Sequence, residues 1–174
     1  AERAGFPPGL MNIVTGKTTE IGAELTGNPL VRKVTFTGST QVGKQLMAEC
    51  AATVKRTSME LGGNAPFIVF DDADVDAAVR GAIISKYRNA GQTCVCSNRI
   101  LVQSSVIEDF TTKFKAAVRS LEMGNGDKEG VVVGPLIDQN AAASVCEFID
   151  DAVSKGAKLI SGGAMSPLGD CFVE

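Results

Sequence analysis

The sequence predicts an α/β fold, a parallel layered sheet with flanking helices. Short apolar blocks alternate along the chain with longer segments whose apolar residues recur at helical spacing. Clusters of Gly, Asn and Pro separate these blocks. When helices connect successive buried strands, the strands pair mostly in parallel, because each crossover returns the chain to the same end of the sheet.

Composition bounds the class of protein. The 174 residues are 44% hydrophobic with a mean hydropathy of +0.12, which is enough for about one domain or parts of two and excludes a disordered chain. The net charge of −3 argues against a nucleic-acid partner. The longest apolar runs, such as residues 67–70, are too short to cross a membrane, so we expect no membrane partner either.

The first part of the chain alternates strands and helices. Apolar and β-branched patterns predict strands over residues 11–14, 31–36, 55–60 and 66–70. Helices are expected over residues 20–25 and 41–52. The last two strands are split by Leu61-Gly62-Gly63-Asn64.

The second part is richer in helices. One helical face is predicted by apolar residues at three- and four-residue spacing, namely Val75, Ala78, Val79, Ala82 and Ile83. A strand is expected over 99–102, followed by a helix that Ser105-x-x-Glu108 opens as a capping box and Gly124-Asn125-Gly126 ends. A further helix over 138–155 and a strand over 158–160 complete the pattern.

Histidine is absent, and the cysteines are few and scattered. Without histidine there can be no Ser-His-Asp triad, no Cys-His dyad and no His-ligated zinc. Five cysteines without a C-x2-C pair fit neither a disulfide framework nor a metal site, so we expect no metal and a reducing intracellular compartment, cytoplasmic or mitochondrial. The chain has no initiator Met and ends without a stop signal, which we interpret as an internal piece of a longer protein, truncated at both ends.

Residues 36–43, Phe-Thr-Gly-Ser-Thr-Gln-Val-Gly, indicate an anion site. A strand runs into Gly38, which allows close backbone approach, and a helix then begins with free N–H groups. The G-x4-G spacing from Gly38 to Gly43 differs from the usual dinucleotide pattern, so an ordinary strand-to-helix turn is the alternative.

Glu60 is a candidate general base. It ends a strand and precedes two glycines, where strand ends meet a crevice. Burial would raise the pKa of its carboxyl group and let it take a proton. The alternative is a solvated glutamate beside a turn.

Cys94 is a candidate nucleophile. Most free cysteines are small buried hydrophobes, but Cys94 follows Gly91 in a polar loop and has Arg88 nearby in the sequence. Such a setting favours a thiol of lowered pKa. The remaining cysteines outside this loop are interpreted as structural: Cys50, Cys146 and Cys171.

The motifs FTGSTQVG, MELGGNAP and RNAGQTC, in this order and spacing, resemble those of the NAD(P)-dependent aldehyde dehydrogenases. The resemblance covers essentially the whole chain, including GPLID and the terminal GG…FVE. The YRNAGQT stretch before Cys-Val-Cys is similar to the succinate-semialdehyde branch of that family.

The resemblance implies a role for each motif. Glu60 would be the general base and Cys94 the nucleophile, while Arg88 would bind the substrate carboxylate beside Cys94 and Asn89 would shape the loop. NAD or NADP would be held by Gly38, Ser39, Thr40, Gln41, Val42 and Gly43. Residues 1–61 would be the C-terminal part of the cofactor-binding domain, and residues 62–174 the N-terminal part of the catalytic domain. The partner would be a small aldehyde, and the parent protein a homo-oligomer.

The resemblance also implies the reaction and its limits. A thiohemiacetal on Cys94 would become a thioester that Glu60 hydrolyses with water. Family segments that supply the oxyanion Asn, the Lys-Pro-x-Glu cofactor strand and the Glu-x-Phe-Gly-Pro contact are absent from this sequence, so we expect the chain alone to be inactive. The alternative function is a non-catalytic piece that acts in binding or assembly.

Cys94-Val95-Cys96 suggests a redox switch. A disulfide between Cys94 and Cys96 would close a small, strained ring, would be easily reduced, and would consume the nucleophile. The competing interpretation is that Cys96 points into the core as a small hydrophobe.

Overall fold

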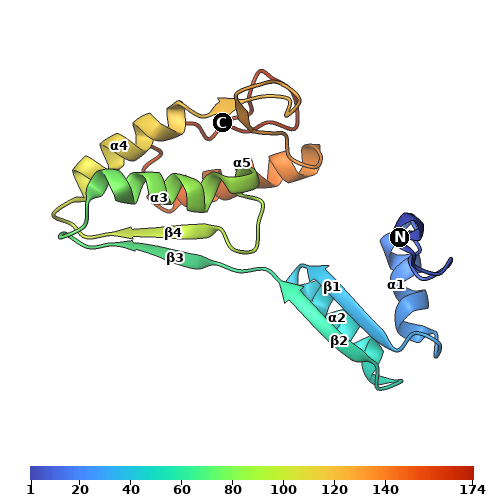
Figure 1. The fold of residues 1–174 in the computed structure, drawn as a ribbon. Helices are drawn as coiled ribbons and strands as arrows, with labels where there is room; N and C mark the ends of the chain where they lie inside the picture. The colour runs from blue at the N-terminus through green and yellow to red at the C-terminus, as the bar shows by residue number, and fades with distance from the viewer. The chain divides into compact units, whose positions relative to one another are not determined.

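The computed structural model describes all of residues 1–174, and these form two compact units, Ala1–Gly62 and Gly63–Glu174 (Figure 1). The boundary expected from the sequence lies one residue earlier, between residues 61 and 62. The assignment of the units to a cofactor-binding and a catalytic domain stays a prediction. None of the helices is long and apolar enough to cross a bilayer.

The first unit is a single strand–helix–strand motif preceded by one α-helix. After a short 3-10 helix, η1 (Glu2–Ala4), its elements are α1 (Thr18–Gly27), β1 (Lys33–Gly38), α2 (Thr40–Ala51) and β2 (Arg56–Leu61). Strands β1 and β2 pair in parallel, with Thr37 opposite Glu60, because α2 carries the chain back to the start of the sheet. Val34 of β1 and Cys50 of α2 are buried in this unit.

The second unit is built on a parallel pair of strands covered by helices. Its elements in order are β3 (Ala65–Val69), α3 (Val75–Tyr87), η2 (Arg88–Gly91), β4 (Ser97–Val102), α4 (Ile107–Arg119), β5 (Glu122–Met123), β6 (Val131–Val133) and α5 (Gln139–Ser154). Strand β3 pairs with β4 and β5 pairs with β6, both in parallel. The core is formed where β3, α3 and α4 meet, by Val69, Val79, Ala82 and Phe110.

Most of the expected helices and strands are present, and all three strand pairs are parallel. Helices α3 and α5 begin at aspartate caps, since the Asp74 and Asp138 side chains accept hydrogen bonds from Ala77 N and Ala141 N. These caps fix the helix starts close to where the sequence pattern predicts them.

Some details of the prediction are wrong. No strand forms over residues 11–14 or 158–160, and apolar side chains there, such as Ile13 (88% exposed), have no strand beside them to pair with. Strands β5 and β6 were not expected. Helix α4 begins after Val106 with no side-chain cap, so the capping box at Ser105 does not form, and the helix ends at Arg119, before Gly124.

Candidate functional site

Glu60 lies at the carboxyl end of the first parallel sheet. In the β1–β2 register it sits opposite Thr37, and Gly38 sits opposite Leu61. Thr37 and Gly38 at the end of β1 therefore belong to the same edge of the sheet as Glu60, where ligands bind in open α/β sheets. Glu60 is exposed, so this unit does not supply the burial that the sequence hypothesis invoked.

The start of α2 offers backbone donors at this edge. Ser39 caps the helix: its Oγ accepts a hydrogen bond from Val42 N at 3.3 Å, and its carbonyl accepts one from Gly43 N at 2.9 Å. N–H groups of a first helical turn have no partner within the helix, and those of Thr40 and Gln41 lie on an exposed part of the chain. A phosphate group fits such a terminus, because both the N–H groups and the helix dipole favour negative charge.

The two glycines of the motif serve close packing. A β-carbon on Gly38 would meet the Phe36 ring, so the ring lies in the space that the missing side chain leaves at the end of β1. Gly43 is buried, and a β-carbon on it would lie 2.6 Å from Leu61 Cδ2. Of the six residues expected to hold the cofactor, Gly43 thus packs the helix against β2.

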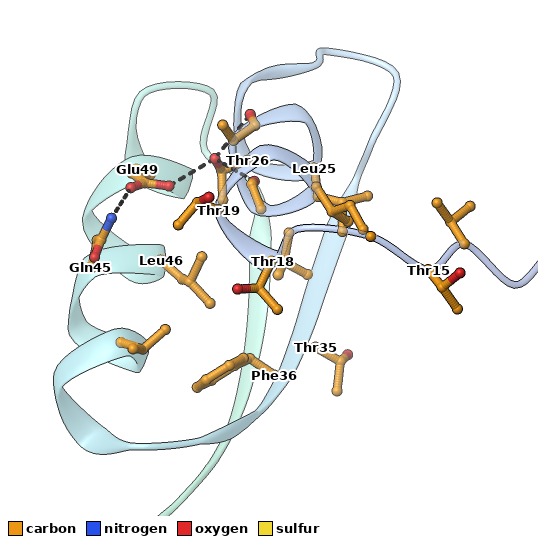
Figure 2. Close-up of a pocket in the computed structure, with 17 residues that line it drawn as sticks. Thr15, Thr18, Thr19, Leu25, Thr26, Thr35, Phe36, Gln45, Leu46 and Glu49 are labelled. Atoms are coloured by element: carbon orange, nitrogen blue, oxygen red, sulfur yellow. Dashed lines mark hydrogen bonds between the residues drawn. The ribbon is translucent and has the colours of Figure 1, made fainter. Parts of the chain in front are cut away.

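A groove of about 830 Å³ lies between α1, β1 and α2 (Figure 2). Its apolar lining includes Leu25, Phe36 and Leu46. Hydroxyl groups line it as well, from Thr15, Thr18, Thr19, Thr26 and Thr35. Apolar walls with a few polar groups are typical of small-molecule sites.

The groove depends on tertiary packing that the sequence did not reveal. Helices α1 and α2 are tied by the buried Thr26, whose hydroxyl lies 2.9 Å from Glu49 Oε2, while Gln45 Nε2 donates to Glu49 Oε1 at 2.8 Å (Figure 2). One feature of the sequence could have indicated the groove. The threonines around the start of α1 are polar, whereas a helix face packed in a core would be apolar.

Cys94 is exposed in the loop between η2 and β4 of the second unit. The base of this loop is closed by two side-chain bridges between α3 and the start of β4. Ser85 Oγ donates to Ser97 Oγ, and Lys86 Nζ donates to Asn98 Oδ1, both at 2.7 Å. These two hydrogen bonds fix the ends of the loop that carries the candidate nucleophile.

The backbone before Cys94 is in the left-handed conformation for three consecutive residues. Asn89, Ala90 and Gly91 have φ of 52°, 54° and 76°. Asn89 Nδ2 also donates to the carbonyl of Gln92 at 3.1 Å, which closes a turn. Glycine adopts this conformation freely, but Ala90 is strained in it. Such strain persists only where the surroundings enforce it, and it gathers at functional loops.

Cys94 and Cys96 are free thiols in opposite environments. Cys96 is 1% exposed, and its Sγ lies 2.8 Å from Thr93 Oγ1. This supports the interpretation that Cys96 points into the core. The disulfide with Cys94 stays a prediction, and it would require Cys96 to leave this buried position.

Arg88 is exposed at the start of η2 and forms no ion pair. Its guanidinium is therefore available to an anion. The preceding Tyr87 fixes the end of α3, because its ring packs on Phe114 at 6.4 Å between centroids. Burial raises the pKa of the Tyr87 hydroxyl.

The expected site residues thus form two groups. Glu60 and the Gly38–Gly43 segment belong to the first unit, and Arg88, Cys94 and Cys96 belong to the second. No group of acidic, cysteine or histidine side chains in the structure could hold a metal ion.

The family model described as the aldehyde dehydrogenase family matches residues 1–174. The chain belongs to the aldehyde dehydrogenase family. It is 64% identical over 174 residues to the glutarate-semialdehyde dehydrogenase of Pseudomonas aeruginosa and covers 36% of that protein. Over the same length it is 56% identical to the NADP(+) succinate-semialdehyde dehydrogenase of Escherichia coli, again covering 36%.

A solved structure agrees with the fold. The crystal structure of an aldehyde dehydrogenase from Brucella melitensis biovar abortus 2308 matches with a TM-score of 0.94 and 63% identity, covering 99% of this chain and 35% of that one. The fold class and the family resemblance inferred from the sequence are confirmed. The chain spans about a third of the length of the relatives it matches.

Proposed function

We propose that this chain carries the nucleophile, the general base and part of the cofactor site of an NAD(P)-dependent dehydrogenase for a semialdehyde with a distal carboxylate. The observation that carries the proposal is the exposed Cys94 on its fixed loop, in a chain 64% identical to a semialdehyde dehydrogenase. Succinate and glutarate semialdehyde are the substrates that the relatives' names suggest.

The residues of the first unit fit NAD or NADP. The N–H groups of Thr40 and Gln41 at the start of α2 would hold the pyrophosphate. The groove between α1 and α2 would take the adenosine end, since its apolar walls suit a purine and its threonines suit a ribose. When bound, the nicotinamide accepts a hydride from the substrate.

Cys94 and Glu60 would each carry out one part of the reaction. Cys94 as thiolate attacks the aldehyde carbon, so that an S–C bond forms and the carbonyl oxygen becomes an oxyanion. Loss of hydride from that carbon leaves a thioester. Glu60 then takes a proton from water, whose oxygen attacks the thioester carbon and releases the acid and the Cys94 thiolate.

Arg88 would select the substrate. Both relatives are named for a semialdehyde, which has a carboxylate at the end opposite the aldehyde. A free guanidinium can hold a carboxylate through two charge-assisted hydrogen bonds. The alternative is that Arg88 is only a solvated residue at the end of a helix.

Replacing the nucleophile tests the proposal. In the full-length polypeptide that contains these residues, Cys94→Ser should reduce aldehyde-dependent NAD(P) reduction to background, because a hydroxyl without an adjacent base is a poor nucleophile. NAD(P) binding, measured by calorimetry, should be unchanged. Cys146→Ser is the matched control and should keep wild-type turnover. Wild-type turnover by Cys94→Ser would refute the proposal.

The alternative of a piece that acts in binding or assembly without catalysis stays a prediction. Aldehyde-dependent NAD(P) reduction by this chain, compared with the full-length polypeptide, separates the two.

A further inference from the structure

The backbone of Gly63 lies directly against the carbonyl group of Cys94. A β-carbon on Gly63 would stand 2.5 Å from the Cys94 oxygen, where ordinary contact begins at 3.4 Å. The φ of Gly63 is not in the left-handed region, so its backbone conformation does not demand glycine. Glycine is needed here because only a residue without a side chain leaves room for the Cys94 peptide.

The strand side of this contact is held in place. Arg99 Nη2 donates to the carbonyl of Asn64 at 2.8 Å, one residue beyond Gly63. Ala65 then enters β3 and pairs with Ser97 of β4. The segment that carries Gly63 therefore cannot easily retreat from the loop.

The loop side is anchored at Cys96 and free at Cys94. Cys96 is buried, and its N–H donates to the Thr93 carbonyl at 3.4 Å. Cys94 is exposed, so its peptide can shift toward solvent. A side chain on Gly63 would consequently be accommodated by a movement of Cys94 of about 0.9 Å, the shortfall from ordinary contact.

We infer that Gly63 is a positioning residue for the nucleophile: the absence of its side chain sets where the Cys94 backbone stands. This rests on the proposed function, since the position matters to turnover only if Cys94 attacks the substrate. A misplacement of about 1 Å in a reacting group can reduce the rate roughly hundredfold.

The test compares two adjacent glycines in the full-length polypeptide. Gly63→Ala should lower kcat roughly hundredfold, while the KM for NAD(P) changes by no more than about threefold, because the cofactor site is untouched. Gly62→Ala is the matched control, since a β-carbon there meets nothing within 4 Å. It should keep kcat within about threefold of wild type.

A second variant tests the mechanism of the effect. Arg99→Ala removes the hydrogen bond that holds Asn64, so in the Gly63→Ala background the strand can yield in place of Cys94. The double variant should recover kcat by about tenfold over Gly63→Ala, whereas independent structural damage would only accumulate. Arg99→Ala alone should stay close to wild type.

Each outcome decides one hypothesis. If Gly63→Ala turns over like Gly62→Ala while Cys94→Ser is inactive, the inference about Gly63 is overturned and the proposed function stands. Loss of the cooperative thermal transition in Gly63→Ala would assign Gly63 to folding and likewise overturn the inference. Wild-type turnover by Cys94→Ser overturns the proposed function itself.

Discussion

Cys94 and Cys96 show how far a residue's role can be predicted from its neighbours in sequence. The polar setting of Cys94 predicted an accessible thiol, and Cys94 is exposed. The burial of Cys96 beside Thr93 was only one of two alternatives, because which side a loop residue faces depends on the turn that contains it. The contact of Gly63 with the Cys94 carbonyl was not predictable, since it joins residues far apart in the chain.

Glu60→Gln should separate the two half-reactions. The amide cannot take a proton from water, so hydrolysis of the thioester should slow by about 10²–10⁴-fold, the usual contribution of a general base. We expect a burst of NAD(P)H followed by slow turnover, with acyl-enzyme visible by mass spectrometry of the intact protein. Glu20→Gln, at an exposed position on α1, is the control. Steady-state turnover at the wild-type rate, without acyl-enzyme, would rule out Glu60 as the base.

Arg88→Gln should weaken binding of substrates that carry a carboxylate. Hydrogen bonds to charged groups contribute about 1.5–3 kcal/mol, so the KM for succinate or glutarate semialdehyde should rise by about tenfold to a hundredfold. The KM for an uncharged aldehyde of similar length should hardly change. Arg88→Lys should recover only part of the loss, because an ammonium group cannot reproduce the paired hydrogen bonds. Equal changes for both aldehydes would leave Arg88 as a solvated helix-end residue.

At the scale of single elements, local patterns predicted helices better than strands. Helices α2, α3 and α5 follow from apolar spacing and capping residues that lie within each segment. The segment 11–14 has the composition of a strand, yet a strand forms only where another strand supplies its hydrogen bonds, and none lies beside it. Strands β5 and β6 are so short that no periodicity could reveal them.

The link between α1 and α2 should weaken in acid. Hydrogen bonds from Gln45 and, second, from Thr26 lower the pKa of the Glu49 carboxyl below its ordinary value. A group whose pKa is lower in the folded state stabilises the fold above its unfolded pKa of about 4.3. That contribution is lost as the pH falls through the folded-state pKa.

The measurement is a pH series of thermal unfolding. Wild type should exceed Glu49→Gln in Tm at neutral pH, and the difference should shrink as the pH falls below about 4.3. Thr26→Val, which keeps the shape but removes one of the two side-chain hydrogen bonds, should show part of the same effect. A Tm difference that is constant across this range would show that the ionised carboxylate does not contribute.

At the scale of the whole molecule, the sequence motifs predict the chemistry. The groove can be recognised only in the folded structure. The motifs that contain Gly38, Glu60 and Cys94 are each short and contiguous in the chain, so the family resemblance is visible in the sequence alone. The groove between α1, β1 and α2 arises from side chains that are separated in the sequence and meet only when the helices pack. For that reason the sequence predicts cofactor-binding residues only between Gly38 and Gly43.

The 174-residue chain alone should not turn over aldehyde. It covers 36% of the glutarate-semialdehyde relative, and the family resemblance implies that the oxyanion donor and further cofactor contacts lie in other segments. Loss of one oxyanion donor removes roughly 3–4 kcal/mol of transition-state stabilisation, which lowers the rate by at least a hundredfold before any loss of cofactor contacts. The assay is NAD(P)H production from succinate and glutarate semialdehyde by the purified chain, with the full-length polypeptide at equal concentration as the positive control.

Iodoacetamide labelling of Cys94, followed by peptide mass spectrometry, shows in the same sample whether the thiol is intact and accessible. Turnover that tracks the chain through purification, and that Cys94→Ser abolishes, would show that these residues suffice for catalysis.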